Sequence, residues 1–187
     1  MNQKVTSRIA YTPGVALPAT ARASLLSFLT VHYAHSPAEF ARRYKGGWLL
    51  WEPDRWAPPA RDGEEHSTMG SSRGNQPKAG DALCYELVIA PGQQITAGRH
   101  KGCELLIDHR TFSRRQLALG CTSVGIYTVA LGQDAKPALH RGAALTSTPR
   151  TLATGDEIVA GDVKLVFFHA ADFRLRLADE QARSSRG

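Results

Sequence analysis

The residues best suited to chemistry in this chain are basic and hydroxyl side chains on either side of a short apolar run. Gly98-Arg99 comes first, and Ser113-Arg114-Arg115 follows after Leu105-Leu106-Ile107. Arginine presents a fixed fork of charged donors to phosphate oxygens, and a serine hydroxyl adds a short neutral donor. Lys101 and Arg110 lie in the flanking loops and would raise the local positive potential. The pattern therefore predicts loops that bind a phosphorylated side chain.

A third signal lies further along the chain, at Leu152-x-x-Gly155-Asp156-x-Ile158-x-x-Gly161. Together with Gly98-Arg99, Cys103 and Ser113-Arg114, it resembles the motif series of the forkhead-associated (FHA) domain. The resemblance covers residues 82–178 and implies an FHA-like antiparallel β-sandwich that binds phosphothreonine. It implies that Arg99 and Ser113 grip the phosphate and that Arg114 adds a further donor.

Two departures from the FHA pattern bear on ligand binding. The family histidine after Ser-Arg-x is Gln116 here, whose amide can still donate and accept hydrogen bonds and so brace the loop. The family turn Gly-Ser-x-Asn-Gly-Thr falls on Gly132–Pro137, where Ala135 replaces the asparagine that fixes the peptide backbone. Asp134 would oppose an incoming phosphate, and Lys136 would offset this repulsion.

The candidate site residues also have structural interpretations. Arg99 could pair with Asp108 or Glu104 at the surface, which contributes at most about 1 kcal/mol. Ser113 could cap a neighbouring backbone N–H. Three functions stay open: phosphothreonine-dependent recognition in Ser/Thr kinase signalling, a degenerate FHA scaffold that binds a protein partner without phosphate, and nucleic-acid binding.

Composition and charge fit a soluble chain that is long enough for one domain with an extension, or for two very small domains. The 187 residues are 42% apolar and 21% charged, and the formal net charge is +6. This balance invites a nucleic-acid partner, but the charge is diffuse and no run of five Lys or Arg occurs. The basic residues therefore predict a local phosphate-seeking patch, and nucleic acid is disfavoured.

Other classes of site find no support in the sequence. Cys84, Cys103 and Cys121 form no Cys-x-x-Cys pair, so they predict buried thiols in a reducing compartment. No nucleotide-binding loop and no nucleophile–base set appears, so we expect a non-enzymatic cytoplasmic protein without cofactor or metal. No apolar run approaches the roughly 18 residues of a membrane helix, and a signal peptide is disfavoured. The expected partner is a phosphothreonine-containing protein, with a Ser/Thr kinase upstream.

Changes in composition and hydrophobic pattern along the chain predict four parts. Residues 1–57 form a helical N-terminal extension, and residues 58–81, rich in Pro, Gly and Ser, form a flexible linker. Residues 82–178 form the β-sandwich domain. Residues 179–187 form a disordered tail.

The extension predicts two helices and a strand. Ala19–Tyr33 has an apolar face at helical spacing, with Thr20 as its cap. Ser36-Pro37-Ala38-Glu39 has the pattern of a capping box and predicts a helix that ends near Tyr44. Trp48–Trp51 predicts a short apolar strand. Trp48, Trp51 and Trp56 form either the core of this extension or, less favoured, a partner-binding patch.

Short β runs separated by turn residues predict an antiparallel sandwich after residue 82. Phe173–Leu177 alternates apolar and basic residues, which is typical of a half-buried strand. The other predicted strands are Leu83–Ala90, Gln94–Ala97, Glu104–Ile107, Arg115–Cys121, Gly125–Leu131, Glu157–Val159 and Val163–Phe168.

Overall fold

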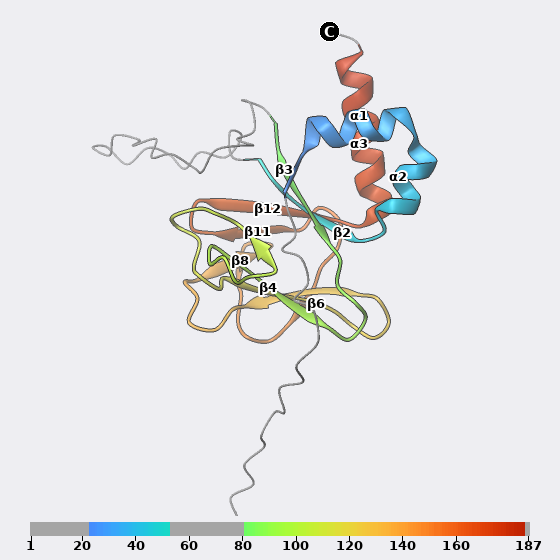
Figure 1. Ribbon diagram of the computed structural model, residues 1–187. Coiled ribbons are helices and arrows are strands. Elements are labelled where there is room, and N and C mark those ends of the chain that lie inside the picture. The colour runs from blue at the N-terminus through green and yellow to red at the C-terminus, as the bar shows by residue number, and fades with distance from the viewer. Residues whose placement is uncertain (1–22, 53–80, 186–187) are drawn as a thin grey trace, which may run out of the picture.

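Two packed β-sheets and a layer of helices make up the described part of the protein (Figure 1). The computed structural model describes residues 23–52 and 81–185. Its seven-stranded sheet has the order β1-β3-β2-β12-β11-β8-β9, and its five-stranded sheet has the order β10-β7-β6-β4-β5. All neighbouring strands run antiparallel except β4 and β5. The predicted, mainly β, antiparallel sandwich is confirmed.

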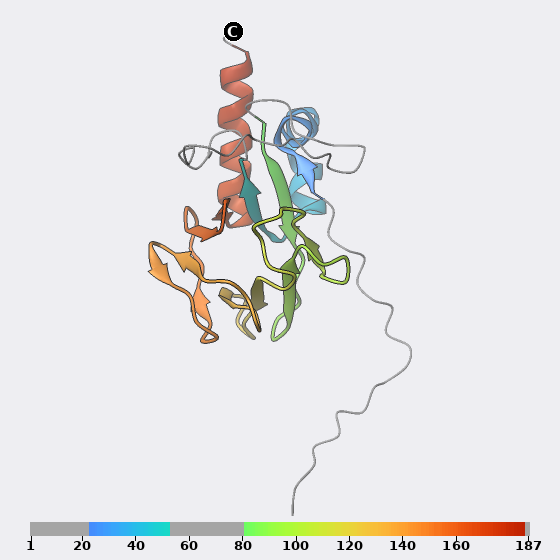
Figure 2. The same ribbon diagram turned by 90° about the vertical axis from the view of Figure 1, so that its left-hand side faces the viewer.

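The strands are β1 (Ser24–Leu25), β2 (Gly47–Trp51), β3 (Leu83–Leu87), β4 (Gln94–Gly98), β5 (Leu105–Leu106), β6 (Leu117–Cys121), β7 (Tyr127–Leu131), β8 (Ala138–His140), β9 (Ala143–Ala144), β10 (Arg150–Thr151), β11 (Glu157–Ala160) and β12 (Val163–Phe168). The helices are α1 (Leu26–His35), α2 (Pro37–Arg43) and α3 (Ala170–Ser184). Both views of the ribbon show the three helices gathered at one side of the sheets (Figure 2).

β2 holds the two sheets and the helices together, because it is buried on both faces. Successive side chains of a strand point to opposite faces of its sheet. Leu49 and Trp51 belong to the core between the two sheets, whereas Trp48 and Leu50 belong to a second core beneath the helices. Trp48 stacks on Phe173 of α3 with 4.3 Å between ring centroids.

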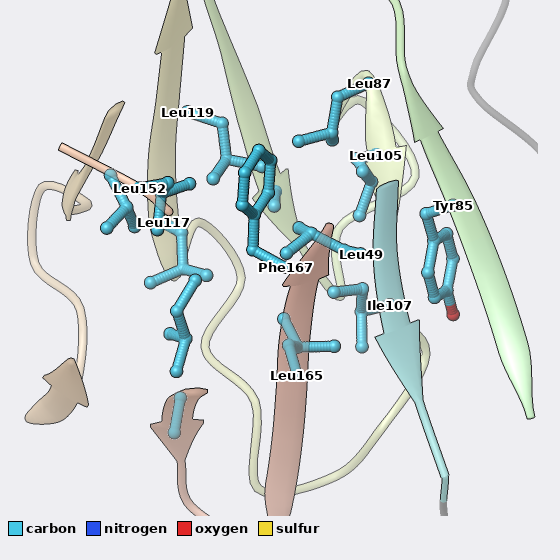
Figure 3. Packing of buried hydrophobic residues seen from close by; sticks show 14 of the residues in the cluster. Leu49, Tyr85, Leu87, Leu105, Ile107, Leu117, Leu119, Leu152, Leu165 and Phe167 are labelled. Carbon is cyan, nitrogen blue, oxygen red and sulfur yellow. The ribbon is translucent and has the colours of Figure 1, made fainter. Parts of the chain in front are cut away.

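Phe167 of β12 lies in the middle of the core between the sheets (Figure 3). Leu49, Leu105 and Leu165 surround it, and each of them is fully buried. Burial of an aliphatic side chain of this size stabilises the fold by about 1.5–3 kcal/mol. This core fixes the strands whose ends carry the candidate site.

The predicted strand Phe173–Leu177 is wrong, since these residues belong to α3. Phe173 and Leu177 are four residues apart, so they share one helix face as well as one strand face. The exposure of Leu175 distinguishes a helix from a strand, because a strand would place Leu175 on the same face as Phe173 and Leu177. Leu175 is 66% exposed, whereas Phe173 and Leu177 are fully buried. The helix continues to Ser184, so the disordered tail predicted over 179–187 is wrong up to that residue.

The predicted N-terminal extension also needs correction. β2 pairs with β3 on one side and with β12 on the other, so residues 1–57 contribute a central strand to the sandwich. The extension and the β-sandwich domain are therefore not separate units. The linker predicted over residues 58–81 lies outside the described residues, apart from Asp81.

The helices of the extension are present with shifted limits. α1 begins at Leu26, where the Asp81 carboxylate accepts the backbone N–H of Ser27 at 3.1 Å. Thr20, the predicted cap, lies outside the described residues. α2 is confirmed as a helix, but Ser36 makes no capping hydrogen bond with its side chain, so the predicted capping box is wrong.

The predicted core role of the tryptophans is confirmed for Trp48 and Trp51, which are buried. Trp56 lies outside the described residues. Cys84, Cys103 and Cys121 are buried free thiols, as the sequence predicts.

Candidate functional site

Three loops meet at one end of the five-stranded sheet because of the register of its strands. Ala97 of β4 pairs with Leu117 of β6, and Leu117 pairs with Leu131 of β7. β4 and β7 end at this edge, and β6 begins there. The loop after β4 carries Arg99. The loop before β6 carries Ser113 and Arg114, and the loop after β7 is Gly132–Pro137.

Backbone hydrogen bonds join the first two loops. The N–H of Arg99 donates to the carbonyl of Ser113 at 3.1 Å, and the N–H of His100 donates to the carbonyl of Arg114 at 3.2 Å. A Cβ atom on Gly98 would lie 2.1 Å from the Arg114 oxygen, so only glycine allows this approach. The Gly-Arg pair of the sequence therefore has a backbone reason, and it brings Arg99 beside Ser113.

Cys103 holds the turn of the first loop. Its N–H donates to the carbonyl of His100 at 2.9 Å, and its thiol donates to the carbonyl of Arg114 at 3.2 Å. Burial raises the pKa of the Cys103 thiol, which keeps it protonated as this hydrogen bond requires. Cys103 therefore has a structural role in this loop.

Gln116 joins the third loop to the second. Its side chain is fully buried, accepts the N–H of Ser113 at 2.9 Å and donates to the carbonyl of Lys136 at 2.7 Å. The backbone N–H of Gln116 donates to the carbonyl of Ala97, and the carbonyl of Gln116 accepts the N–H of Gly132. The prediction that Gln116 braces the loop is confirmed.

Ser113 also contacts the third loop. Its hydroxyl oxygen accepts the N–H of Lys136 at 2.9 Å, so the hydroxyl hydrogen remains available for a ligand. A Cβ atom on Gly132 would lie 2.3 Å from the Arg115 carbonyl oxygen, so glycine is required here too. The capping interpretation of Ser113 is thus correct and is compatible with ligand binding.

The three loops enclose a cleft of about 520 Å³. Four of the five predicted site residues line it: Arg99, Arg110, Ser113 and Arg114. The fifth, Lys101, is exposed on the first loop and is not among the lining residues. The remaining lining residues are His100, Phe112, Arg115, Gln133, Asp134 and Lys136.

The sequence analysis gave no role in the site to three of these polar residues, which are His100, Arg115 and Gln133. His100 directly follows Arg99, and its Nδ1 accepts the N–H of Gly102 at 3.1 Å, which leaves Nε2 as the N–H donor of the neutral ring. Arg115 directly follows Arg114. Adjacency to the motif residues was the available signal, but it does not tell which side chain faces the cleft.

The cleft is strongly positive. Five basic side chains line it against Asp134, and within residues 23–52 and 81–185 none of the five forms an ion pair. Arg99 does not pair with Asp108 or Glu104; the Glu104 carboxylate accepts the N–H of Thr96 at 2.9 Å instead. Asp134 has a left-handed backbone, with φ of 56°. The basic groups are therefore not neutralised by the described part of the chain.

Asp156 of the third motif has a structural role at a distance from the cleft lining. Its carboxylate accepts hydrogen bonds from Arg141, from the N–H of Ala153 at 2.9 Å and from His140 Nε2 at 2.9 Å. Burial would raise the pKa of this carboxyl, but these hydrogen bonds and the Arg141 charge outweigh burial and lower the pKa. The network ties the β11 hairpin to β8.

Metal-ligating clusters and membrane-spanning helices are both absent from residues 23–52 and 81–185. No group of three or more His, Cys, Asp or Glu residues there has the arrangement of a metal site. None of the described helices has both the length and the apolar character needed to cross a membrane.

Solved structures similar to this one include the N-terminal FHA domain of S. cerevisiae Rad53p in complex with a phosphothreonine peptide. It is 20% identical, with a TM-score of 0.39, over 44% of this chain and 73% of that chain. The FHA domain of FhaA, complexed with the intracellular domain of Rv3910, is 16% identical with a TM-score of 0.43. The match covers 66% of this chain and 100% of that chain. The FHA domain of an Arabidopsis thaliana hypothetical protein is 22% identical with a TM-score of 0.44, over 67% and 86% of the two chains.

All three are FHA domains. This is the family that the sequence motifs resemble. No protein-family model matches the sequence, and no curated protein matches it. Because the TM-scores lie below 0.5 and the identities below 25%, the function has to be inferred from the residues of the cleft.

Proposed function

We propose that this protein is a non-enzymatic recognition module that binds a phosphothreonine-containing segment of a partner protein. The observation that carries the proposal is the juxtaposition of Arg99, Ser113 and Arg114 at one positive cleft. A phosphate that leaves water needs charged donors in place of its hydration shell, and arginine forks with a serine hydroxyl supply them. The proposal implies a Ser/Thr kinase acting upstream.

The test is titration of a phosphothreonine peptide library and its unphosphorylated twin against the full chain. Charge-assisted hydrogen bonds contribute about 1.5–3 kcal/mol each, so Arg99→Ala should weaken phosphopeptide binding about ten- to a hundredfold. Ser113→Ala should cost less, because it removes a neutral donor. Arg42→Ala is the matched control, since Arg42 is exposed on α2 and does not line the cleft.

A phosphate-independent scaffold is the second candidate, and the carboxylate of Asp134 in the cleft favours it. A carboxylate repels a phosphate, and Ala135 has no side-chain group to hold a peptide backbone. This candidate predicts equal binding of phosphorylated and unphosphorylated peptides, unaffected by Arg99→Ala. That result would reject phosphothreonine recognition.

A further inference from the structure

Two turns meet at the end of the five-stranded sheet that lies opposite the cleft. β4 begins and β6 ends there, whereas the cleft lies at the other ends of the same strands. The N–H of Gly92, in the turn between β3 and β4, donates to the carbonyl of Cys121 at 2.7 Å. The N–H of Cys121, just before the turn between β6 and β7, donates to the carbonyl of Gln93 at 3.0 Å. Residues 88–93 and 122–126 therefore form one surface, which we name the distal surface.

The distal surface is apolar and uncharged. Val88, Val124 and Ile126 are 76%, 78% and 43% exposed, and they are three of the seven exposed large apolar side chains within residues 23–52 and 81–185. Neither turn contains an Asp, Glu, Lys or Arg. Contiguous apolar surface marks contacts between proteins, and the centre of such a contact is depleted in charged residues.

The net charge of the chain indicates which partner fits this surface. With a formal net charge of +6, two copies of the chain repel each other wherever their basic residues approach. Two distal surfaces meet without bringing charges together, and they leave the positive clefts at the far ends. Nucleic acid and phosphorylated segments are attracted to the cleft instead. We propose that the distal surface binds the distal surface of a second copy of this chain, in a dimer whose two clefts face away from each other.

A two-fold axis makes the contact self-complementary, because the same patch serves on both copies. The exposed side chains are Val and Ile, whose stiff χ1 angles lose little freedom on contact. The patch is small, so the dimer belongs to the weak and transient class. The contact does not involve the cleft, so this inference stands or falls independently of phosphothreonine binding. Two outward clefts would suit a partner that carries two phosphothreonines, since the second binding event becomes intramolecular.

Sedimentation velocity of the full chain tests the inference. A concentration series up to about 1 mM detects weak association, and we expect a reversible dimer within it. Raising the salt from about 0.05 M to about 0.5 M should leave the dimer unchanged or strengthen it, because salt screens the repulsion between the two positive copies. Self-association through the positive cleft would instead weaken as the salt rises.

Substitutions locate the contact. Val124→Lys and Ser123→Lys should each raise the dissociation constant of the dimer about tenfold or more, because the two-fold axis brings both new charges into one contact. Both residues are exposed in a turn, so the fold is retained, which circular dichroism checks. Leu175→Lys is the matched control, since Leu175 is an exposed apolar residue of α3 away from the distal surface. It should change the dissociation constant less than about threefold.

Three results would overturn the inference. The first is a chain that stays monomeric at every concentration and salt. The second is a dimer that weakens as the salt rises. The third is a dimer that survives Val124→Lys and Ser123→Lys but is lost with Arg99→Ala or Leu175→Lys, because it then uses another surface. None of these results bears on the proposed function, whose test is the Arg99-dependent binding of a phosphopeptide.

Discussion

Gln116→Ala should destabilise the protein by about 3–5 kcal/mol. The substitution removes two hydrogen bonds, one from the Ser113 N–H at 2.9 Å and one to the Lys136 carbonyl at 2.7 Å. A buried polar group left without its partner costs about 1–3 kcal/mol. Ser113 is half-buried and Lys136 is exposed, so water replaces part of each bond and the lower half of that range applies. The space left by the fully buried side chain adds about 1 kcal/mol.

Gln116→Glu separates the hydrogen bonds from the volume of the side chain. The carboxylate keeps the shape and can accept the Ser113 N–H, but it cannot donate to the Lys136 carbonyl. Burial raises the pKa of such a carboxyl above its unfolded value of about 4.3. The stability of the variant should therefore be highest below that unfolded value and should fall as the pH rises through the folded pKa, whereas Gln116→Ala should show no such dependence.

Urea denaturation followed by tryptophan fluorescence measures both variants, and the peptide titration described above measures binding. Gln94→Ala is the control, since Gln94 is an exposed residue of β4 with no side-chain hydrogen bond in the described part of the chain. We expect Gln116→Ala to weaken phosphopeptide binding as well, because it releases the third loop. The reasoning fails if Gln116→Ala unfolds at the same urea concentration as Gln94→Ala.

Four further outcomes test other parts of the structure. Asp134→Asn should strengthen phosphopeptide binding about twofold to fivefold in titration, because it removes a repelling carboxylate and suits the left-handed φ of 56°. The pKa of Asp156 is lowered in the folded state, so its carboxylate stabilises the protein above the unfolded pKa of about 3.9, and this stability is lost as the pH falls through the folded pKa. In denaturation experiments across pH, Asp156→Asn should therefore make the free energy of unfolding less dependent on pH in the acid range. Leu177→Ala should cost about 2–5 kcal/mol in denaturation and Leu175→Ala should cost little; equal costs would contradict the helical assignment. A fragment of residues 82–178 lacks β2 and should show no cooperative unfolding in circular dichroism, whereas a folded fragment would contradict the central place of that strand.

The sandwich could be predicted from the sequence because alternation of apolar and polar residues indicates half-buried strands, and turn residues indicate where the strands end. β4, β6, β7, β11 and β12 lie within a few residues of their predicted limits. The place of β2 could not be predicted, since local pattern gives a strand but not its neighbours, and its partners lie far away in the chain. Periodicity also misassigned Phe173–Leu177, because two apolar residues four apart satisfy both the strand and the helix period.

The site divides in the same way. Arg99, Ser113 and Arg114 could be predicted from the motif, because they lie next to regular strands. Arg99 directly follows β4, and Ser113 and Arg114 lie shortly before β6. Lys101 was expected to support the cleft but does not line it, and Arg115 lines it unexpectedly. Both lie in loops, where the direction of a side chain depends on backbone contacts between segments distant in sequence. Such contacts are visible only in three dimensions.

The motif residues fall into two groups once their contacts are known. Gly98 allows the close approach of two loops, Cys103 bonds the Arg114 carbonyl, and Asp156 binds three donors, so the fold alone explains these residues. The side chains of Arg99 and Arg114 have no hydrogen bond or ion pair within the described residues, although the backbone around them is tightly bonded. A rigid backbone that presents unpaired arginines at a cleft reduces the cost of ordering them around an anion. Structural needs account for the geometry of this site, and the proposed anionic ligand would account for its charge.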